Sequence, residues 1–513
     1  MGLLGSPHET GVILKSLLEE VSMKKYFFLS LMLVLATGAY AGNPVTVDST
    51  NATPDGVNTF STITSAISSW CAGGTNAGQT APFVINVVNG PYSENIRIDK
   101  GLVGLGDIVG ELIIQAATPV NIRLNPSSTV GGMLLYQDTY DVTFNNFIFS
   151  PDAGSSYVMN TLIMINDPAS PAMNRNWVKF YNCVFTEAYD TGAPMVTDKA
   201  SALANKDALP GTRSGKMSAS AGKCLMKGAT NNGLQSVRLD NCVLYGPPQI
   251  GFELNVRAGD DIIVHDTLAV YCAYSAYRCL GNAVANQSFT GTDAGAGPTQ
   301  CTAIINSPWS VASTAANGKA LRFEASAAVT STVSNVLISN SFLSGNAYVG
   351  GININGNQGS VNMDNVIIDT HGDSILMQPA NACTLSNATL NSSARAGIAF
   401  TAAAAGSLTV TNTIFSGAGT KITGTVPTAG LSVNYSAFVE SGPDAITARY
   451  AGQVITYGVN IINNDPEFKS KDVTNEDFFD LASGYYPTKG IGGTDVAGGA
   501  DCDATAIADW MLY

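Results

Sequence analysis

The feature that most constrains this chain is a short recurring unit, an asparagine followed by two or three apolar residues. Steps of 25, 22, 25 and 23 residues separate the copies that begin at Asn340, Asn365, Asn387, Asn412 and, with tyrosine in place of asparagine, Tyr435. Earlier copies begin at Asn146, Asn182, Asn241 and Asp266. A repeat of this period, rich in strand-forming and turn residues, predicts a solenoid whose units each bury one face on their neighbours.

A second element, a Gly- or Ala-led segment of alternating character, keeps the same phase, for example at Phe252, Leu321, Ile352 and Ile398. Alternation directs one set of side chains inward and the other outward. Two or three short strands per repeat leave no room for a crossover helix or for a propeller blade, which needs about 40 residues. The pattern therefore predicts an all-β chain folded as a parallel β-helix.

The charge composition limits the kinds of binding partner that we expect. Charged residues make up 12% of the 513 residues, against about 25% in an average soluble domain. The net charge is −14 and the pI is about 4.6. Nucleic acids and anionic membranes need a basic face, so we expect neither as a partner.

The N-terminus resembles a secretory signal. Residues 1–22 precede a second methionine and read as an over-extended start. Residues 23–41 combine a Lys-Lys start, a short apolar run and an Ala-Tyr-Ala exit, which is typical of a signal peptide. A membrane anchor would need about 20 apolar residues. We therefore expect a secreted or cell-surface bacterial protein with no membrane span in its mature form.

The rest of the chain divides into three parts. Residues 42–80 form an N-terminal cap, with helical apolar spacing from Phe60 to Trp70. Residues 81–463 form the β-helix, with inserted loops near 186–220 and 281–318. Residues 464–513 lose the repeat and are expected to form a C-terminal capping tail.

Nine cysteines are present, an odd number for an exported chain. Most are expected to be small buried core residues. Cys183 and Cys242 share the context Asn-Cys-Val, which predicts equivalent positions, either stacked or bridged.

Two segments resemble a known family. Phe60-Ser-Thr-Ile, followed by Gly90-Pro-Tyr-Ser-Glu94, is similar to the opening of pectinesterase-like proteins in the pectin-lyase-like superfamily, and Asp465-Pro-Glu-Phe resembles the closing segment of many secreted bacterial β-helix proteins. The resemblance implies a single-stranded, right-handed parallel β-helix.

The catalytic motifs of the family are not intact. Gln137-Asp138 looks like part of the esterase motif, but no second aspartate follows one repeat later, and the Gly-His-Gly element of the polygalacturonase type does not occur. Asp260-Asp261 and Asp369-Thr-His371-Gly-Asp373 could supply hydrolase carboxylates, but such residues more often hydrogen-bond their own turns.

The candidate site follows from aligning the Gly-led strands. The alignment predicts an outward ladder, and its members are Ile113/Gln115, Leu134/Tyr136, Ile163/Ile165, Leu225/Lys227, Glu253/Asn255/Arg257, Arg322/Glu324, Asn353/Asn355, Leu376/Gln378, Ala399/Thr401 and Ser432/Asn434. Its charges concentrate in the middle repeats, on a face that would form a groove.

Mixed charges on such a face suit the β-elimination of acidic polysaccharides. A base removes the proton beside a carboxylate while a cation neutralises that carboxylate. We expect Lys227 as the preferred base, Arg257 and Arg322 as further catalytic candidates, and Ca²⁺ held by Glu253, Asn255 and Glu324. The substrate-binding candidates are Asn353, Asn355, Gln378 and Tyr136. Alternatively, the charges form surface ion pairs worth about 0–1 kcal/mol each.

Two functions remain in competition. One is a carbohydrate-binding protein for an extracellular, uronate-containing polysaccharide, with polysaccharide lyase activity favoured over glycoside hydrolase or carbohydrate esterase activity. The other is a non-catalytic structural or adhesive solenoid at the cell surface.

Overall fold

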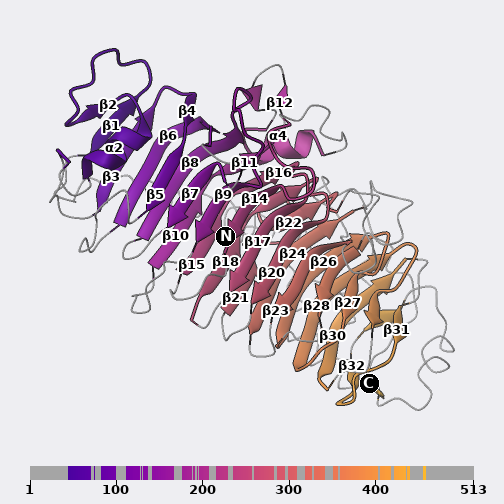
Figure 1. The fold of residues 1–513 in the computed structure, drawn as a ribbon. Coiled ribbons are helices and arrows are strands. Elements are labelled where there is room, and N and C mark those ends of the chain that lie inside the picture. The colour runs from indigo at the N-terminus through magenta and orange to yellow at the C-terminus, as the bar shows by residue number, and fades with distance from the viewer. Residues whose placement is uncertain are drawn as a thin grey trace, which may run out of the picture.

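The computed structural model describes residues 44–438 and Ile455–Tyr457, with gaps at 71–73, 76–81, 100–110, 127–128, 130, 137–140, 167–175, 188, 191–192, 195, 207–214, 229–234, 257–258, 282–285, 295–297, 309–317, 326–328, 341–349, 356–358, 402–404, 418–420 and 435. The signal segment and the tail at 464–513 lie outside these residues. The described chain is all-β, and none of its helices is long and apolar enough to cross a membrane. Figure 1 shows an elongated stack of strands that runs from the cap at one end to the last repeats at the other.

One long parallel sheet, sheet B, contains 11 strands within the described residues. Every neighbouring pair in it is parallel, and each strand belongs to the next repeat along the chain. In chain order its strands are β5 (Ile96–Asp99), β7 (Met133–Tyr136), β9 (Thr161–Asn166), β14 (Lys223–Lys227), β17 (Ile250–Val256), β20 (Ser275–Gly281), β23 (Lys319–Ala325), β25 (Gly350–Ile354), β27 (Ile375–Met377), β29 (Ile398–Phe400) and β31 (Ile422–Gly424).

The second sheet, sheet A, contains 21 strands in the same part of the chain, and the chain alternates between the two sheets. Its strands are β1 (Val45–Asp48), β2 (Thr59–Phe60), β3 (Phe83–Val88), β4 (Tyr92–Glu94), β6 (Glu111–Leu124), β8 (Asp141–Pro151), β10 (Asn176–Tyr181), β11 (Val184–Thr186), β15 (Gln235–Asp240), β16 (Val243–Tyr245), β18 (Asp261–His265), β19 (Leu268–Val270), β21 (Asn286–Thr290), β22 (Thr302–Ile305), β24 (Thr330–Ser339), β26 (Val361–Thr370), β28 (Ala382–Ser392), β30 (Ser407–Ser416), β32 (Leu431–Asn434), β33 (Ala437–Phe438) and β34 (Ile455–Tyr457).

The recurring asparagines sit where sheet A bends. Asn387 and Asn412, for example, have φ values of 51° and 52°, a left-handed conformation that asparagine tolerates better than most residues. Their side chains form a ladder along the stack, because the Asn412 amide donates to Asn387 at 2.7 Å, as the Asn241 amide does to Asn182. In one repeat the sequence prediction is off by five residues: Asn335, within β24, has the positive φ, whereas Asn340 follows the end of that strand.

The core between the sheets is a column of aromatic rings. Inward-facing rings contact one another in series, mostly edge to face, at centroid distances of 5.3 to 5.7 Å; the series is Phe144, Phe180, Phe185, Phe252, Tyr277, Phe289 and Phe323. All of these side chains are fully buried. The strict alternation in the sequence thus produces one continuous apolar interior.

The helix predicted within the N-terminal segment 42–80 is present. Helix α2 (Ile63–Trp70) buries Trp70, whose ring stacks on Phe83 at 5.1 Å. Glu94, the last residue of the Gly-x-Tyr-x-Glu segment, accepts hydrogen bonds from the backbone amides of Ile63 and Thr64, both at 2.8 Å. This segment therefore caps the helix.

The two predicted insertions differ. The segment 186–220 contains the hairpin β12 (Tyr189–Asp190) and β13 (Ala193–Pro194) and helix α4 (Lys199–Ala204). Ala202 joins a second apolar cluster, which includes Val243 and Tyr271, on the outer side of sheet A. The segment 281–318 is not a single inserted loop, because it contains β21 and β22, the sheet A strands of an ordinary repeat.

The seven cysteines in the described residues are free and buried. Cys183 and Cys242 are stacked rather than bridged, and burial raises the pKa of the Cys183 thiol, with Cys242 adding to the effect. The sequence expectation of core cysteines is confirmed for these seven, and Cys71 and Cys502 lie outside the described residues.

Candidate functional site

Three charged residues of the predicted ladder, Glu253, Arg322 and Glu324, lie together on sheet B, and they are joined by two residues that the sequence analysis did not include, Arg278 and Lys223. In register, Glu253 of β17 lies beside Arg278 of β20, which lies beside Arg322 of β23, which lies beside Asn353 of β25. Two residues further along the strands, Asn255 is aligned through Leu280 with Glu324. We call Lys223, Glu253, Arg278, Arg322 and Glu324 the charged cluster.

Sequence reasoning missed Arg278, although it follows Glu253 by 25 residues, which is one repeat. Its strand begins Ser-Ala-Tyr and lacks the leading glycine by which the other strands were aligned. The repeat period alone would have found it.

Ion pairs connect the whole cluster. Lys223 Nζ lies 2.7 Å from Glu253 Oε1, and Arg278 Nη1 lies 3.3 Å from Glu253 Oε2. Arg278 Nε lies 2.9 Å from Glu324 Oε2, while Arg322 pairs with Glu324 Oε1. Arg278 therefore bridges two carboxylates that belong to different repeats.

The cluster is largely shielded from solvent. The side chains of Glu253, Arg322 and Glu324 are 7%, 8% and 10% exposed, and that of Arg278 is 31% exposed. The pKa of the Arg322 guanidinium is lowered, chiefly because burial disfavours its charge; Glu324 opposes the shift and Arg278 adds to it. Among the described residues, no hydrogen-bond acceptor reaches the buried Arg322 Nε.

The outward placement of Lys227 is wrong. Lys227 is in register with Leu254 and Ile165, which point into the core, and the outward position beside Glu253 belongs to Met226. A register shift of one residue reverses the face of a side chain. Lys227 is fully buried and pairs with the equally buried Asp260 at 2.7 Å, so it cannot act as a base on a ligand at the outer face.

The ladder is also shorter than expected. Ile113/Gln115 and Ser432/Asn434 belong to sheet A, on β6 and β32. Ile163 and Ile165 point inward. The predicted ladder therefore mixed residues from both sheets and both faces.

The remaining predicted residues lie around the cluster. Asn353 is buried beside Arg322, Asn355 is exposed, and Gln378 is partly buried one repeat further on. The Asn255 amide is used structurally, because it donates to the Lys227 carbonyl at 3.1 Å. Tyr136 is the last residue of β7, but its side chain is not among the parts that the structure describes. Arg257 lies outside the described residues.

The cluster does not fit the expected calcium ion. Each of the four carboxylate oxygens of Glu253 and Glu324 already lies within ion-pair distance of a lysine or arginine. Nor do the described residues contain a group of three or more His, Cys, Asp or Glu side chains placed to hold a metal. A cation would have to displace Lys223 or the arginines.

The alternative hydrolase carboxylates do not act together. Asp260 is buried against Lys227, whereas the next residue, Asp261, points to the opposite face of β18 and accepts a hydrogen bond from Asn286. Asp373 pairs with the buried Lys319. Each of these three carboxylates contacts a side chain from another strand rather than the backbone of its own turn, so the turn interpretation does not describe them.

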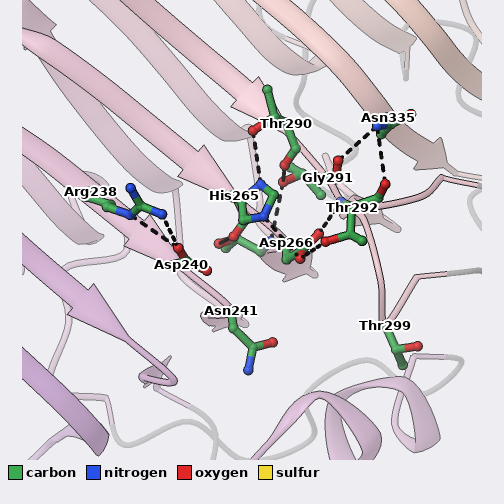
Figure 2. Close-up of polar contacts among 12 residues, drawn as sticks. Arg238, Asp240, Asn241, His265, Asp266, Thr290, Gly291, Thr292, Thr299 and Asn335 are labelled. Carbon is green, nitrogen blue, oxygen red and sulfur yellow. Dashed lines mark hydrogen bonds and ion pairs between the residues drawn. The ribbon is translucent and has the colours of Figure 1, made fainter. Parts of the chain in front are cut away.

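A second polar group surrounds His265, at the bend of sheet A (Figure 2). Its ring contacts Asp266 through Nε2 at 3.3 Å and Thr290 through Nδ1 at 3.1 Å. Asp266, at the left-handed bend position, accepts hydrogen bonds from the amide and hydroxyl of Thr292 at 2.7 and 2.6 Å. These contacts tie one repeat to the next and replace the asparagine ladder at this level.

Fold and site thus define an all-β protein of long parallel sheets with an ion-paired cluster on the outer face of sheet B. Comparison with family models, with curated proteins and with solved structures finds no match to this chain.

Proposed function

We propose that the chain is an exported, right-handed parallel β-helix protein of the pectin-lyase-like type that binds an acidic extracellular polysaccharide. The β-helix is supported by the alternation between sheets and by the parallel pairing of each repeat with the next. The helical cap on the first repeat, with Glu94 at its N-terminus, agrees with the family resemblance.

The observation that carries the binding proposal is the charge of the cluster. Three cations, Lys223, Arg278 and Arg322, face two carboxylates, so this face is locally positive on a chain of net charge −14. The partly exposed guanidinium of Arg278 is accessible to a carboxylate, which guanidinium groups bind well. Each uronate unit of an acidic polysaccharide carries such a carboxylate.

Binding is tested with polygalacturonate, alginate and glycosaminoglycans, with a neutral glucan as the control ligand, at several salt concentrations and with and without a chelator. Absorbance of unsaturated products in the same samples tests lyase activity and a calcium requirement. We expect binding to one acidic polymer that weakens with salt. Absence of binding across the whole panel would overturn the proposal.

Two variants locate the site. Arg278→Met removes the exposed cation of the cluster, and Arg238→Met removes a cation on the outer face of sheet A, where Arg238 pairs with Asp240 at 2.5 Å. Loss of a charge-assisted contact worth at least about 1.4 kcal/mol weakens binding about tenfold. We expect this loss for Arg278→Met only, and equal losses in both variants would move the binding site away from the cluster.

The second candidate is a structural solenoid without a ligand. It is favoured by the complete pairing of the Glu253 and Glu324 oxygens within the cluster, which is what an ion-paired structural ladder needs. If the protein is a structural solenoid, Arg278→Met lowers its free energy of unfolding, and the unsubstituted protein binds none of the polysaccharides tested.

A further inference from the structure

Two lysines, Lys227 and Lys319, have fully buried side chains inside the stack of strands. Lys227, the last residue of β14, and Asp260, directly before β18, both have fully buried side chains. Their Nζ and Oδ2 atoms are 2.7 Å apart. The pair joins two successive repeats from within the core.

The surroundings hold the lysine in place. The residues in register with Lys227 on the two neighbouring strands, Ile165 and Leu254, are fully buried and apolar. Lys227 Nζ also donates to the backbone carbonyl of Asn255 at 2.8 Å, and the Asn255 amide donates back to the Lys227 carbonyl. The amine is thus directed at the carboxyl group.

Burying both charges is costly, since each ion loses several kcal/mol of hydration free energy. Attraction between the partners offsets this only in part. Converting the two charged groups into one neutral amide removes the cost. Holding the reacting groups in contact also supplies the proximity that such a reaction requires.

We propose that Lys227 and Asp260 condense into an intramolecular amide cross-link. One proton moves along the hydrogen bond from Nζ to Oδ2, and the neutral amine attacks the Asp260 carboxyl carbon. The C–N bond forms, the C–O bond breaks, and the departing oxygen leaves as water with a second proton from Nζ. Ammonium and carboxylate therefore yield amide and one water, with no oxidant, reductant or other reactant.

The other buried pair provides an internal comparison. Lys319 Nζ lies 3.4 Å from Asp373 Oδ2, farther than in the first pair. Asp373 is also shared, because Arg395 Nε lies 3.7 Å from its Oδ1 and the Ala396 amide donates to the same oxygen at 3.3 Å. These contacts divide Asp373 among several donors, so we expect this pair not to condense.

Peptide mapping of the denatured protein by mass spectrometry tests the cross-link. Trypsin cannot cleave after an acylated lysine, so a cross-linked Lys227 stays within the peptide 224–238, joined to the peptide 258–278 that contains Asp260. We expect this branched species, lighter than the sum of its parts by one water, and fragmentation that locates the amide. Recovery of the linear peptide 224–227 from the bulk of the sample would overturn the proposal.

Two variants sharpen the assignment. Asp260→Ala must abolish the branched peptide, whereas Lys319→Met must leave it unchanged. The map of the unsubstituted protein decides the question even where Asp260→Ala fails to fold. A branched peptide that survives Asp260→Ala would assign the cross-link to another carboxyl group and refute the proposal.

Discussion

Glu94 should determine whether the N-terminal cap stays attached. Its carboxylate is almost completely buried and accepts three hydrogen bonds at 2.8 Å, from the Ile63 and Thr64 amides and from the Thr64 hydroxyl. Those two amides belong to the first turn of α2, where backbone donors lack partners within the helix. The negative charge also lies at the positive end of the helix dipole.

The cost of Glu94→Ala can be worked out from these contacts. Hydrogen bonds to a charged group contribute about 1.5–3 kcal/mol each, so loss of the two backbone bonds alone removes about 3–6 kcal/mol. Glu94→Gln keeps one acceptor oxygen but places an amide donor against a backbone donor, so we expect about half that loss. Ser93→Ala, at the neighbouring exposed position, is the control and should change stability by no more than about 0.5 kcal/mol.

Hydrogen exchange in the peptide that contains Ile63–Trp70 is the appropriate assay, because repeat proteins open locally and global unfolding is not two-state. A loss of about 3 kcal/mol accelerates exchange by at least about a hundredfold. Buried Trp70, stacked on Phe83, should become accessible to a fluorescence quencher at the same time. Unchanged exchange in Glu94→Ala would show that packing of α2, rather than its cap, holds the helix.

Three further predictions concern the core, the bend and pH. Phe180→Ala, which removes a buried ring between Phe144 and Phe185, should lower the free energy of local opening of β10 and β11 by about 3–5 kcal/mol, measured by hydrogen exchange, and a loss below about 1 kcal/mol would contradict the packed aromatic core. At the left-handed bend, Asn387→Gly should be less destabilising than Asn387→Ala, because both lose the ladder bonds but alanine adds about 1–2 kcal/mol of backbone strain; equal melting temperatures would refute this. Burial raises the pKa of the Cys272 thiol to about 12 and that of the Tyr277 hydroxyl well above its ordinary value. In the unfolded chain the thiol ionises as pH rises above 9 and the hydroxyl as pH rises above 10, their ordinary values. Stability should therefore fall by about 1.4 kcal/mol per pH unit for each group above its own value, and a denaturation midpoint that stays flat from about pH 9 to 11 would contradict this.

The sequence predicts the repeat and the cap because both depend on local patterns. Alternating apolar residues place the aromatic column, and asparagines place most bends, since few other residues adopt a positive φ without strain. Asn340 misled the prediction because it precedes apolar residues as the true bend residue, Asn335, does. The positive φ of Asn335 and the end of β24 before Asn340 distinguish the two, and neither can be read from the sequence.

Register is the part that the sequence does not determine. A pattern of period two is equally regular when it is displaced by one residue, and only pairing with Leu254 shows that Lys227 belongs to the inward set. Buried charge is improbable by composition rules, so an outward lysine is the natural prediction. The partner that makes the burial tolerable, Asp260, comes from another strand, where no local pattern reveals it.

The order of the charges along the cluster helps to decide whether it is a stabilising ion-pair ladder or a ligand-binding site. Strands in register lie about 4.8 Å apart, and like charges directly opposite each other are destabilising. A ladder selected for stability would alternate sign from repeat to repeat, yet Arg278 and Arg322 are neighbours in register. Glu324, which bonds both, compensates for the repulsion without removing it. Because proteins violate such local rules mainly where function requires it, exchange of Arg322 for glutamine should raise stability or leave it unchanged while weakening polysaccharide binding. A destabilised variant with intact binding would instead make the adjacent arginines part of the scaffold.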